Sequence, residues 1–181
     1  SPPYASKVKV CQGQLPIFLT VPSGSPRNRR KTGNCPPFTP AVTGKAARVY
    51  VDGSAIGNPG PAGVGVVIEC PGGQEIEISE FLGEATNNQA EYRALLRALE
   101  ECGARSIGEA TFLLDSELVV RQIRGEYRVK QAELLALHAQ ARAALQSGRY
   151  RLEQVGRQEN RRANVLAQNA ARLGQVSPPQ A

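Results

Sequence analysis

Three acidic residues stand where their carboxylates could meet at one edge of a folded sheet. Asp52, Glu91 and Asp115 are far apart in the sequence, yet each lies where a predicted strand ends or a predicted helix begins. Ligand sites of sheets that carry helices on both faces cluster at the carboxyl ends of the strands. Carboxylates are hard oxygen ligands that suit Mg2+. Chemistry that depends on a divalent cation is therefore the first possibility.

Each acid also has an ordinary structural interpretation. Glu91 could complete a capping box with Asn88, Asp115 could cap a helix, and Asp52 could be a turn residue. Against a cap, Glu91 lies four residues before Leu95, on the apolar stripe of its predicted helix. A carboxylate buried on such a face needs a partner, and a metal ion is a good one.

The spacing of apolar residues predicts the elements that would position these acids. Strands are predicted over 48–52, 63–69, 75–82, 110–115 and 149–155, and helices from after Gly83 to Gly103 and over 116–123, 132–145 and 160–174. The residues expected to face the core are Leu95, Ala98, Leu99 and Cys102 on the first helix, Leu134, Leu135, Leu137, Ala141 and Leu145 on the third, and Ala163, Leu166, Ala170 and Leu173 on the last. This order of elements predicts an α/β fold, a mixed five-stranded sheet with helices on both faces.

Charge divides the chain into unequal parts. The 181 residues carry a formal net charge of +6, and residues 1–44 supply all of it, with six Lys or Arg, no Asp or Glu, and eight of the 13 prolines. Such a composition buries too little apolar surface to order itself. The expected organisation is a flexible basic tail over 1–44, a catalytic domain over 45–174 and a disordered end over 175–181.

Neither a membrane-spanning segment nor a zinc-binding site is expected. No segment approaches the roughly 20 apolar residues of a membrane span, and no secretion signal opens the chain, so a cytoplasmic monomer without a membrane partner is predicted. The four cysteines, Cys11, Cys35, Cys70 and Cys102, lack the spacing of zinc ligands. They are expected to be reduced thiols.

Four motifs resemble those of type 1 ribonuclease H, in the family's order and at compatible spacing, over about residues 46–174. They are Val51-Asp52-Gly53-Ser54 with Gly57-Asn58-Pro59-Gly60, Thr86-Asn87-Asn88-Gln89-Ala90-Glu91, Asp115-Ser116-Glu117, and Glu159-Asn160-Arg161-Arg162-Ala163-Asn164. The resemblance implies the ribonuclease H-like fold and hydrolysis of the RNA strand of an RNA–DNA hybrid. It implies two Mg2+ ions, replaceable by Mn2+, held by Asp52, Glu91, Asp115 and Asn164. It also implies nucleic-acid contacts from Gly53, Ser54, Asn58, Asn87, Asn88, Ser116 and Asn160, although exposed turn asparagines are the plain alternative for Asn58, Asn87 and Asn88.

Asn164 departs from the family, which has an acid at this position. Two cations about 3.5 to 4 Å apart repel each other, and an amide lends an oxygen but no charge to offset that repulsion. A weaker metal site and slower turnover are expected. A hybrid-binding protein with little catalysis is the alternative, and both a natural variant and a deliberate substitution fit the sequence. A different nuclease of the same fold fits the motifs less well.

Two segments that handle substrate in relatives are shorter here. A short connection over 125–129 replaces the basic helical protrusion of many relatives, and the loop over 155–158 lacks their histidine. Basic residues near the motifs could bind phosphates of the DNA strand; they are Arg121, Arg124, Arg128, Lys130, Arg157, Arg161 and Arg162. The basic tail could replace the protrusion or be an inert extension.

The tail generates the first prediction. If Arg27, Arg29, Arg30 and Lys31 bind phosphates, deletion of residues 1–44 should weaken hybrid binding and reduce the slope of log affinity against log salt by roughly two to four units. The kcat at saturating substrate should stay nearly unchanged, because no metal ligand is lost. Binding of both proteins across a salt titration tests this, and identical slopes would mean that the tail is inert.

Overall fold

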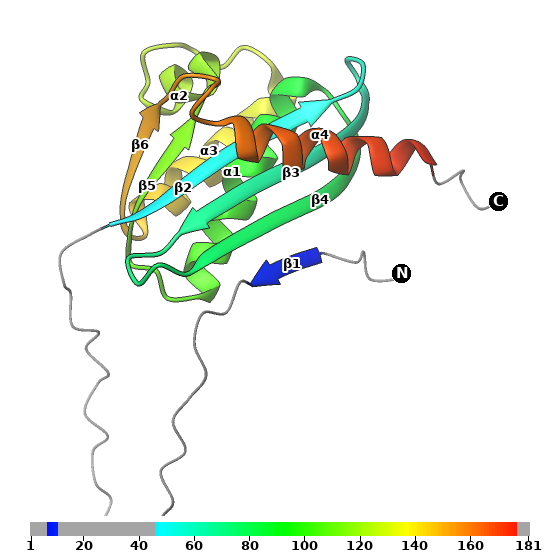
Figure 1. The fold of residues 1–181 in the computed structure, drawn as a ribbon. Coiled ribbons are helices and arrows are strands. Elements are labelled where there is room, and N and C mark those ends of the chain that lie inside the picture. The colour runs from blue at the N-terminus through cyan, green and yellow to red at the C-terminus, as the bar shows by residue number, and fades with distance from the viewer. Residues whose placement is uncertain (1–6, 11–45, 177–181) are drawn as a thin grey trace, which may run out of the picture.

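The computed structural model describes residues 7–10 and 46–176, and Figure 1 shows their arrangement. The elements are β1 (Lys7–Val10), β2 (Ala47–Ala55), β3 (Gly60–Glu69), β4 (Glu75–Ala85), α1 (Asn87–Ala104), β5 (Glu109–Leu114), α2 (Glu117–Ile123), α3 (Ala132–Gln146), β6 (Arg149–Gln154) and α4 (Arg161–Val176). None of the helices in the described part of the chain has the length and apolar composition of a membrane span.

The strands form one mixed sheet in the order β1-β4-β3-β2-β5-β6. β2, β3 and β4 pair antiparallel, whereas β5 runs parallel to both β2 and β6. The five predicted strands are confirmed as β2 to β6, and the helices expected to cover both faces of their sheet are also present.

β1 adds a sixth strand that the sequence did not predict. Its four residues pair antiparallel with β4, with Val8 opposite Ile78. They belong to the segment that was expected to be flexible. The rest of that tail and residues 177–181 lie outside the described residues, and α4 continues to Val176, two residues past the expected end of the domain.

Helices cover the two faces of the sheet unequally (Figure 1). α4 lies alone on one face, across β2, β3 and β4, while α1 and α3 lie behind the sheet with α2 at its upper end in this view. The main core lies between the sheet and α1, where Leu95, Ala98, Leu99 and Cys102 are buried as predicted.

The core-facing residues expected on α3 and α4 are only partly right. On α3, Leu134 and Ala141 are buried, but Leu135 is 50% exposed. On α4 the buried residues are all alanines, Ala163, Ala167, Ala170 and Ala171. Leu173, expected to be buried, is 65% exposed because it lies to one side of the stripe formed by these alanines.

Glycines allow the helices to approach the sheet this closely. A Cβ on Gly65 would lie 2.0 Å from the carbonyl oxygen of Ala163, and a Cβ on Gly63 would lie 2.4 Å from that of Ala167. On the opposite face a Cβ on Gly53 would lie 2.2 Å from the carbonyl carbon of Ala90. Both helices therefore contact the sheet almost backbone to backbone, and no side chain larger than hydrogen fits at these positions.

We predict that Gly65→Ala lowers the free energy of unfolding by about 1 to 3 kcal/mol, because the added methyl group forces α4 away from β3. Gly103→Ala is the matched control, since a Cβ there meets nothing within 4 Å. Urea denaturation followed by circular dichroism measures both variants. Equal stability of the two would contradict the proposed fit between α4 and β3.

Candidate active site

The three acidic residues singled out in the sequence meet at one end of the sheet. Asp52 lies on β2, Asp115 follows β5 directly, and Glu91 lies on α1. β2 and β5 pair in parallel with Val51 opposite Leu114, so the residues that follow these two emerge side by side. One carboxylate oxygen from each acid lies within 4.8 Å of the other two.

The acids are withdrawn from solvent. Asp52 is 2% exposed and Glu91 is 6% exposed. The backbone N–H of Gly53 donates to the Glu91 carboxylate, but Glu91 Oε2 is buried and has no hydrogen-bond partner among the described residues. A buried carboxylate oxygen without a donor is costly unless a cation contacts it.

Glu91 does not cap its helix. The N-terminal capping box of α1 is formed by Thr86 and Gln89, whose side chains each accept a hydrogen bond from the other's backbone N–H. The capping alternative for Glu91 was therefore wrong. Asp115 is likewise not an N-cap, because that position of α2 is Ser116, whose side chain makes no capping hydrogen bond.

Burial and neighbouring charge raise the pKa of two of the acids, Asp52 and Glu91. Burial first, and then the neighbouring charge of Asp115, raise the pKa of Asp52 from its ordinary 3.8 to about 7. The pKa of Glu91 is raised well above its usual range, by burial and then by the charges of Asp52 and Asp115. Asp52 and Glu91 resist ionising together, so they suit a divalent cation, which replaces the protons as their counter-charge.

Asn164 lies beside the cluster but turns its nitrogen toward it. Asn164 Nδ2 donates to Asp52 Oδ2 at 3.2 Å, and Asn164 Oδ1 accepts from Gln168 Nε2 at 2.9 Å. The structure thus brings all four predicted metal ligands together, although the fourth presents a donor instead of an oxygen. Gln168 was missed by the sequence analysis; its only signal was its position one helical turn after Asn164, on the same face of α4.

Two residues expected to contact nucleic acid, Asn160 and Gly53, are buried, although Gly53 also lines the cleft that contains the acids. The Asn160 side chain is fully buried, and its Nδ2 donates to the Val51 carbonyl oxygen at 2.8 Å and to Asp115 Oδ1 at 3.1 Å. It therefore holds Asp115 in place, and it is not exposed for a groove contact. Gly53 lies against the Ala90 backbone, where its role is to let α1 approach β2.

The remaining predicted contact residues lie at or near the surface. Asn58 Oδ1 accepts from the Asn87 backbone N–H at 3.2 Å, and Asn87 Oδ1 accepts from the Ala55 backbone N–H at 3.3 Å. These bonds attach the loop between β2 and β3 to the start of α1. Ser54 and Ser116 line the cleft of about 480 Å3 that contains the acids.

Among the described residues, Arg157 is the basic side chain that forms an ion pair with one of the acids. Its Nε lies 3.9 Å from Asp115 Oδ2, and the side chain is 85% exposed. It comes from the loop in which relatives were expected to carry a histidine. An exposed guanidinium at the mouth of the cleft offsets part of the negative charge and is placed to meet a phosphate.

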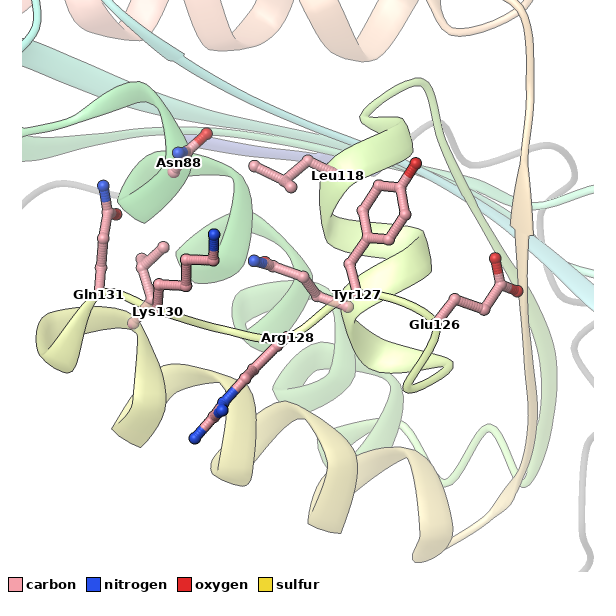
Figure 2. A pocket seen from close by; sticks show the side chains of 9 residues that line it. Asn88, Leu118, Glu126, Tyr127, Arg128, Lys130 and Gln131 are labelled. Carbon is pink, nitrogen blue, oxygen red and sulfur yellow. The ribbon is translucent and has the colours of Figure 1, made fainter.

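A second groove of about 460 Å3 lies between α1, α2 and the connection from α2 to α3 (Figure 2). It is lined by Asn88, Leu118, Gln122, Glu126, Tyr127, Arg128, Lys130, Gln131 and Leu134. Tyr127 is 44% exposed and lies under the guanidinium of Arg121, which is 5.1 Å from the ring centroid and donates to the Tyr127 hydroxyl at 3.0 Å. The groove therefore combines an aromatic ring with basic and amide side chains. His138 on α3 packs edge-on against Tyr92 of α1, and its Nε2 lies 3.1 Å from the Gln122 carbonyl oxygen.

The mixed sheet, with α4 on one face and three carboxylates at the ends of β2 and β5 and on α1, defines a domain of the ribonuclease H class. A family model described as reverse transcriptase-like matches residues 50–170. Ribonuclease HI of Halobacterium salinarum is among the relatives, and the chain belongs to the ribonuclease H family.

The relatives differ in how much of their length the chain spans. It is 42% identical over 125 residues to the bifunctional protein Rv2228c of Mycobacterium tuberculosis. The matched region covers 67% of this chain but only 34% of that protein. It is 37% identical over 129 residues to ribonuclease HI of Halobacterium salinarum, covering 70% of this chain and 65% of the relative. The chain thus spans about a third of the length of the mycobacterial protein.

Solved structures agree with this assignment. RNase H1 of Halobacterium salinarum matches with a TM-score of 0.67 and 34% identity, over 73% of this chain and all of that chain. LC11-RNase H1, in complex with an RNA/DNA hybrid, matches with a TM-score of 0.66 and 38% identity, over 71% and 99% of the two chains.

The pKa shifts predict how stability depends on pH. A carboxyl group whose pKa is higher in the folded than in the unfolded protein binds protons more tightly when folded, so its contribution is present at low pH and is lost as pH rises. In EDTA, Tm should therefore fall between about pH 4 and pH 7, the ordinary and the raised pKa of Asp52. Mg2+ should raise Tm more at pH 8 than at pH 5, because it binds the ionised acids; a ligand at a hundred times its Kd adds about 2.7 kcal/mol.

Differential scanning fluorimetry at each pH, with EDTA or Mg2+, measures this effect. The double variant Asp52→Asn/Glu91→Gln is the control, and its Tm should depend less on pH and not respond to Mg2+. A wild-type Tm in EDTA that rises from pH 5 to pH 8 would contradict the assigned shifts.

Proposed function

We propose that this chain is an endoribonuclease that hydrolyses the RNA strand of RNA–DNA hybrids with two divalent cations, Mg2+ or Mn2+. The observation that carries the proposal is the convergence of Asp52, Glu91 and Asp115 within 4.8 Å in a domain of the ribonuclease H family. As expected from the sequence, the proposed enzyme acts as a monomer in the cytoplasm.

Some residues of the site would bind the cations, and others orient the residues that bind them. Asp52, Glu91 and Asp115 would hold the cations, which when bound supply charge stabilisation at the phosphodiester and an activated water. Asn160 fixes the orientation of Asp115 through one hydrogen bond and is itself tied to β2 through another. The Gly53 N–H does the same for Glu91. Such supporting contacts keep ligands in place before the substrate arrives.

Recognition of RNA is assigned to the asparagines beside the acids. Since the side-chain oxygens of Asn58 and Asn87 accept from backbone N–H groups, their amide nitrogens are left to donate outward. A minor groove displays 2′-hydroxyl groups and base edges to such donors, and the 2′-hydroxyl distinguishes RNA from DNA. The hybrid in the LC11-RNase H1 complex supports this substrate class.

The second groove is assigned to the backbone of the hybrid. It begins at Asn88, next to the predicted RNA contacts, and carries Arg128 and Lys130 on the short connection that replaces a basic protrusion (Figure 2). Basic side chains there would bind phosphates without reading sequence. Tyr127 would offer its exposed ring to a sugar or base.

A hybrid-binding protein with little catalysis is the second candidate. The observation that favours it is the Asn164 amide, which directs a nitrogen toward Asp52 and brings no charge to the cation site. The groove residues are unaffected by this substitution. Cleavage and binding therefore have to be measured separately on the same hybrid.

The first test uses labelled RNA–DNA hybrid, with duplex RNA and duplex DNA as controls. Wild-type protein should cleave only the hybrid, and only with Mg2+ or Mn2+. Asp115→Asn should abolish cleavage while hybrid affinity stays within about tenfold, because metal positioning and groove contacts are separable. Glu117→Gln, which removes a charge two residues away and outside the cleft, should retain activity.

Cleavage that survives EDTA, or equal cleavage of plain DNA, would refute the proposal. Binding without any cleavage would favour the second candidate.

The groove is tested by removing its two basic residues. Arg128→Ala/Lys130→Ala should weaken hybrid binding and lower the slope of log affinity against log salt by about one to two units, because each lost phosphate contact contributes about 0.9 on B-form DNA. Arg142→Ala/Arg172→Ala removes the same charge from exposed sites outside both grooves and is the matched control. Fluorescence anisotropy across a salt titration measures both. Equal slopes for the two double variants would remove this groove from the binding surface.

A further inference from the structure

We infer that Gln168 is a positioning residue, which fixes the Asn164 amide with its nitrogen on Asp52 and its oxygen away from the acid cluster. The protein in the absence of nucleic acid would then hold one divalent cation tightly and a second one weakly. The inference deepens the proposed function, because it concerns the cation site of that same activity.

The hydrogen-bond partners determine which way the amide faces. In the ionised state that binds cations, the Asp52 carboxylate only accepts hydrogen bonds, so the Asn164 atom 3.2 Å from Asp52 Oδ2 is the nitrogen. The oxygen then faces Gln168 Nε2, which donates to it at 2.9 Å. The two contacts form a chain from Gln168 through Asn164 to Asp52 in which every donor meets an acceptor.

The backbone cannot move to relieve this arrangement. Ala163 and Ala167, which alternate with Asn164 and Gln168 along α4, lie against Gly65 and Gly63 at distances that leave no space for a Cβ on either glycine. For Asn164 to offer its oxygen to a cation, the side chain has to rotate and lose the bonds to both Asp52 and Gln168. A cation at this position would therefore compete with two existing hydrogen bonds.

Charge acts in the same direction. Three ionised carboxylates carry a charge of −3, so one divalent cation leaves −1 and a second one leaves +1. The second cation enters a site that no longer attracts it strongly, and repulsion from the first adds to the cost. A fourth carboxylate at position 164 would bring the state with two cations to zero.

Calorimetric titration with Mn2+ of the nucleic-acid-free protein tests the inference, with electron paramagnetic resonance as a count of bound ions. Wild type should bind one ion tightly and a second at least about tenfold more weakly, the factor that one net hydrogen bond is worth. Asn164→Asp should strengthen the second site by more than this factor. Binding of two ions with equal affinity to wild type would overturn the inference.

Gln168→Glu isolates the orientation of the amide. A carboxylate at position 168 accepts where glutamine donates, so Asn164 should turn its nitrogen toward it and its oxygen toward the cluster. The second Mn2+ should then bind about tenfold more tightly than in wild type. The control is Asn164→Ala/Gln168→Glu, which adds the same negative charge without the amide and should gain less. An equal gain in both variants would overturn the inference, since charge alone would explain it.

Gln168→Leu provides a second variant if Gln168→Glu does not fold. It frees the amide without adding charge and should shift the second-site affinity in the same direction, by less. In 1H–15N spectra it should also move the side-chain amide signals of Asn164, which are assigned by their loss in Asn164→Asp. Unmoved signals and unchanged affinity would overturn the positioning role.

The cleavage assay separates this inference from the proposed function. One tight and one weak ion without hybrid cleavage would refute the proposed function and leave the inference standing. Efficient cleavage by a wild-type protein that binds two ions with equal affinity would support the proposed function and refute the inference. Failure of every variant to bind Mn2+ would refute both.

Discussion

The close approach of α1 and α4 to the middle of the sheet is the contact on which the site depends. Gly53 faces the Ala90 backbone on one side, and Gly63 and Gly65 face the inner alanines of α4 on the other. Asp52 lies next to Gly53 on β2, so the same few residues that bring the helices together also set the positions of Glu91 and Asn164. A side chain at Gly53 would displace α1 with Glu91, and one at Gly63 or Gly65 would displace α4 with Asn164.

The acids gathered in this way lie close together and largely withdrawn from water. Asp52 and Glu91 are almost completely buried, and the basic group that pairs with the cluster in the described part of the chain is the exposed Arg157, at 3.9 Å from Asp115. Neutral donors provide the remaining support, namely the Asn160 and Asn164 amides and the Gly53 N–H. They orient the carboxylates without neutralising them. Buried carboxylates that are held in place, but whose negative charge is not balanced by nearby basic groups, form a site that favours the binding of a cation.

Asn164 shows how one substitution can alter a site without altering its shape. An amide and a carboxylate have nearly the same size, so α4 fits the sheet in either case. The amide differs from a carboxylate in its charge and in donating a hydrogen bond to Asp52 instead of offering an oxygen. The Gln168 side chain favours this direction of the hydrogen bond, because it donates to the Asn164 oxygen. The proposed function thus assigns the affinity for a second cation and the binding of the hybrid to different residues.

The sequence by itself determined the order of the elements, the five principal strands, the buried stripe of α1 and the identity of the three acids. These follow from local patterns, because apolar periodicity and motif spacing are properties of neighbouring residues. The tertiary structure decided what depends on partners far away in the chain. It buried Asn160 against β2, selected Thr86 and Gln89 over Glu91 as the cap of α1, exposed Leu173 and paired β1 with β4. It also directed the Asn164 nitrogen toward Asp52, since that choice requires a carboxylate 112 positions away to lie within hydrogen-bonding distance.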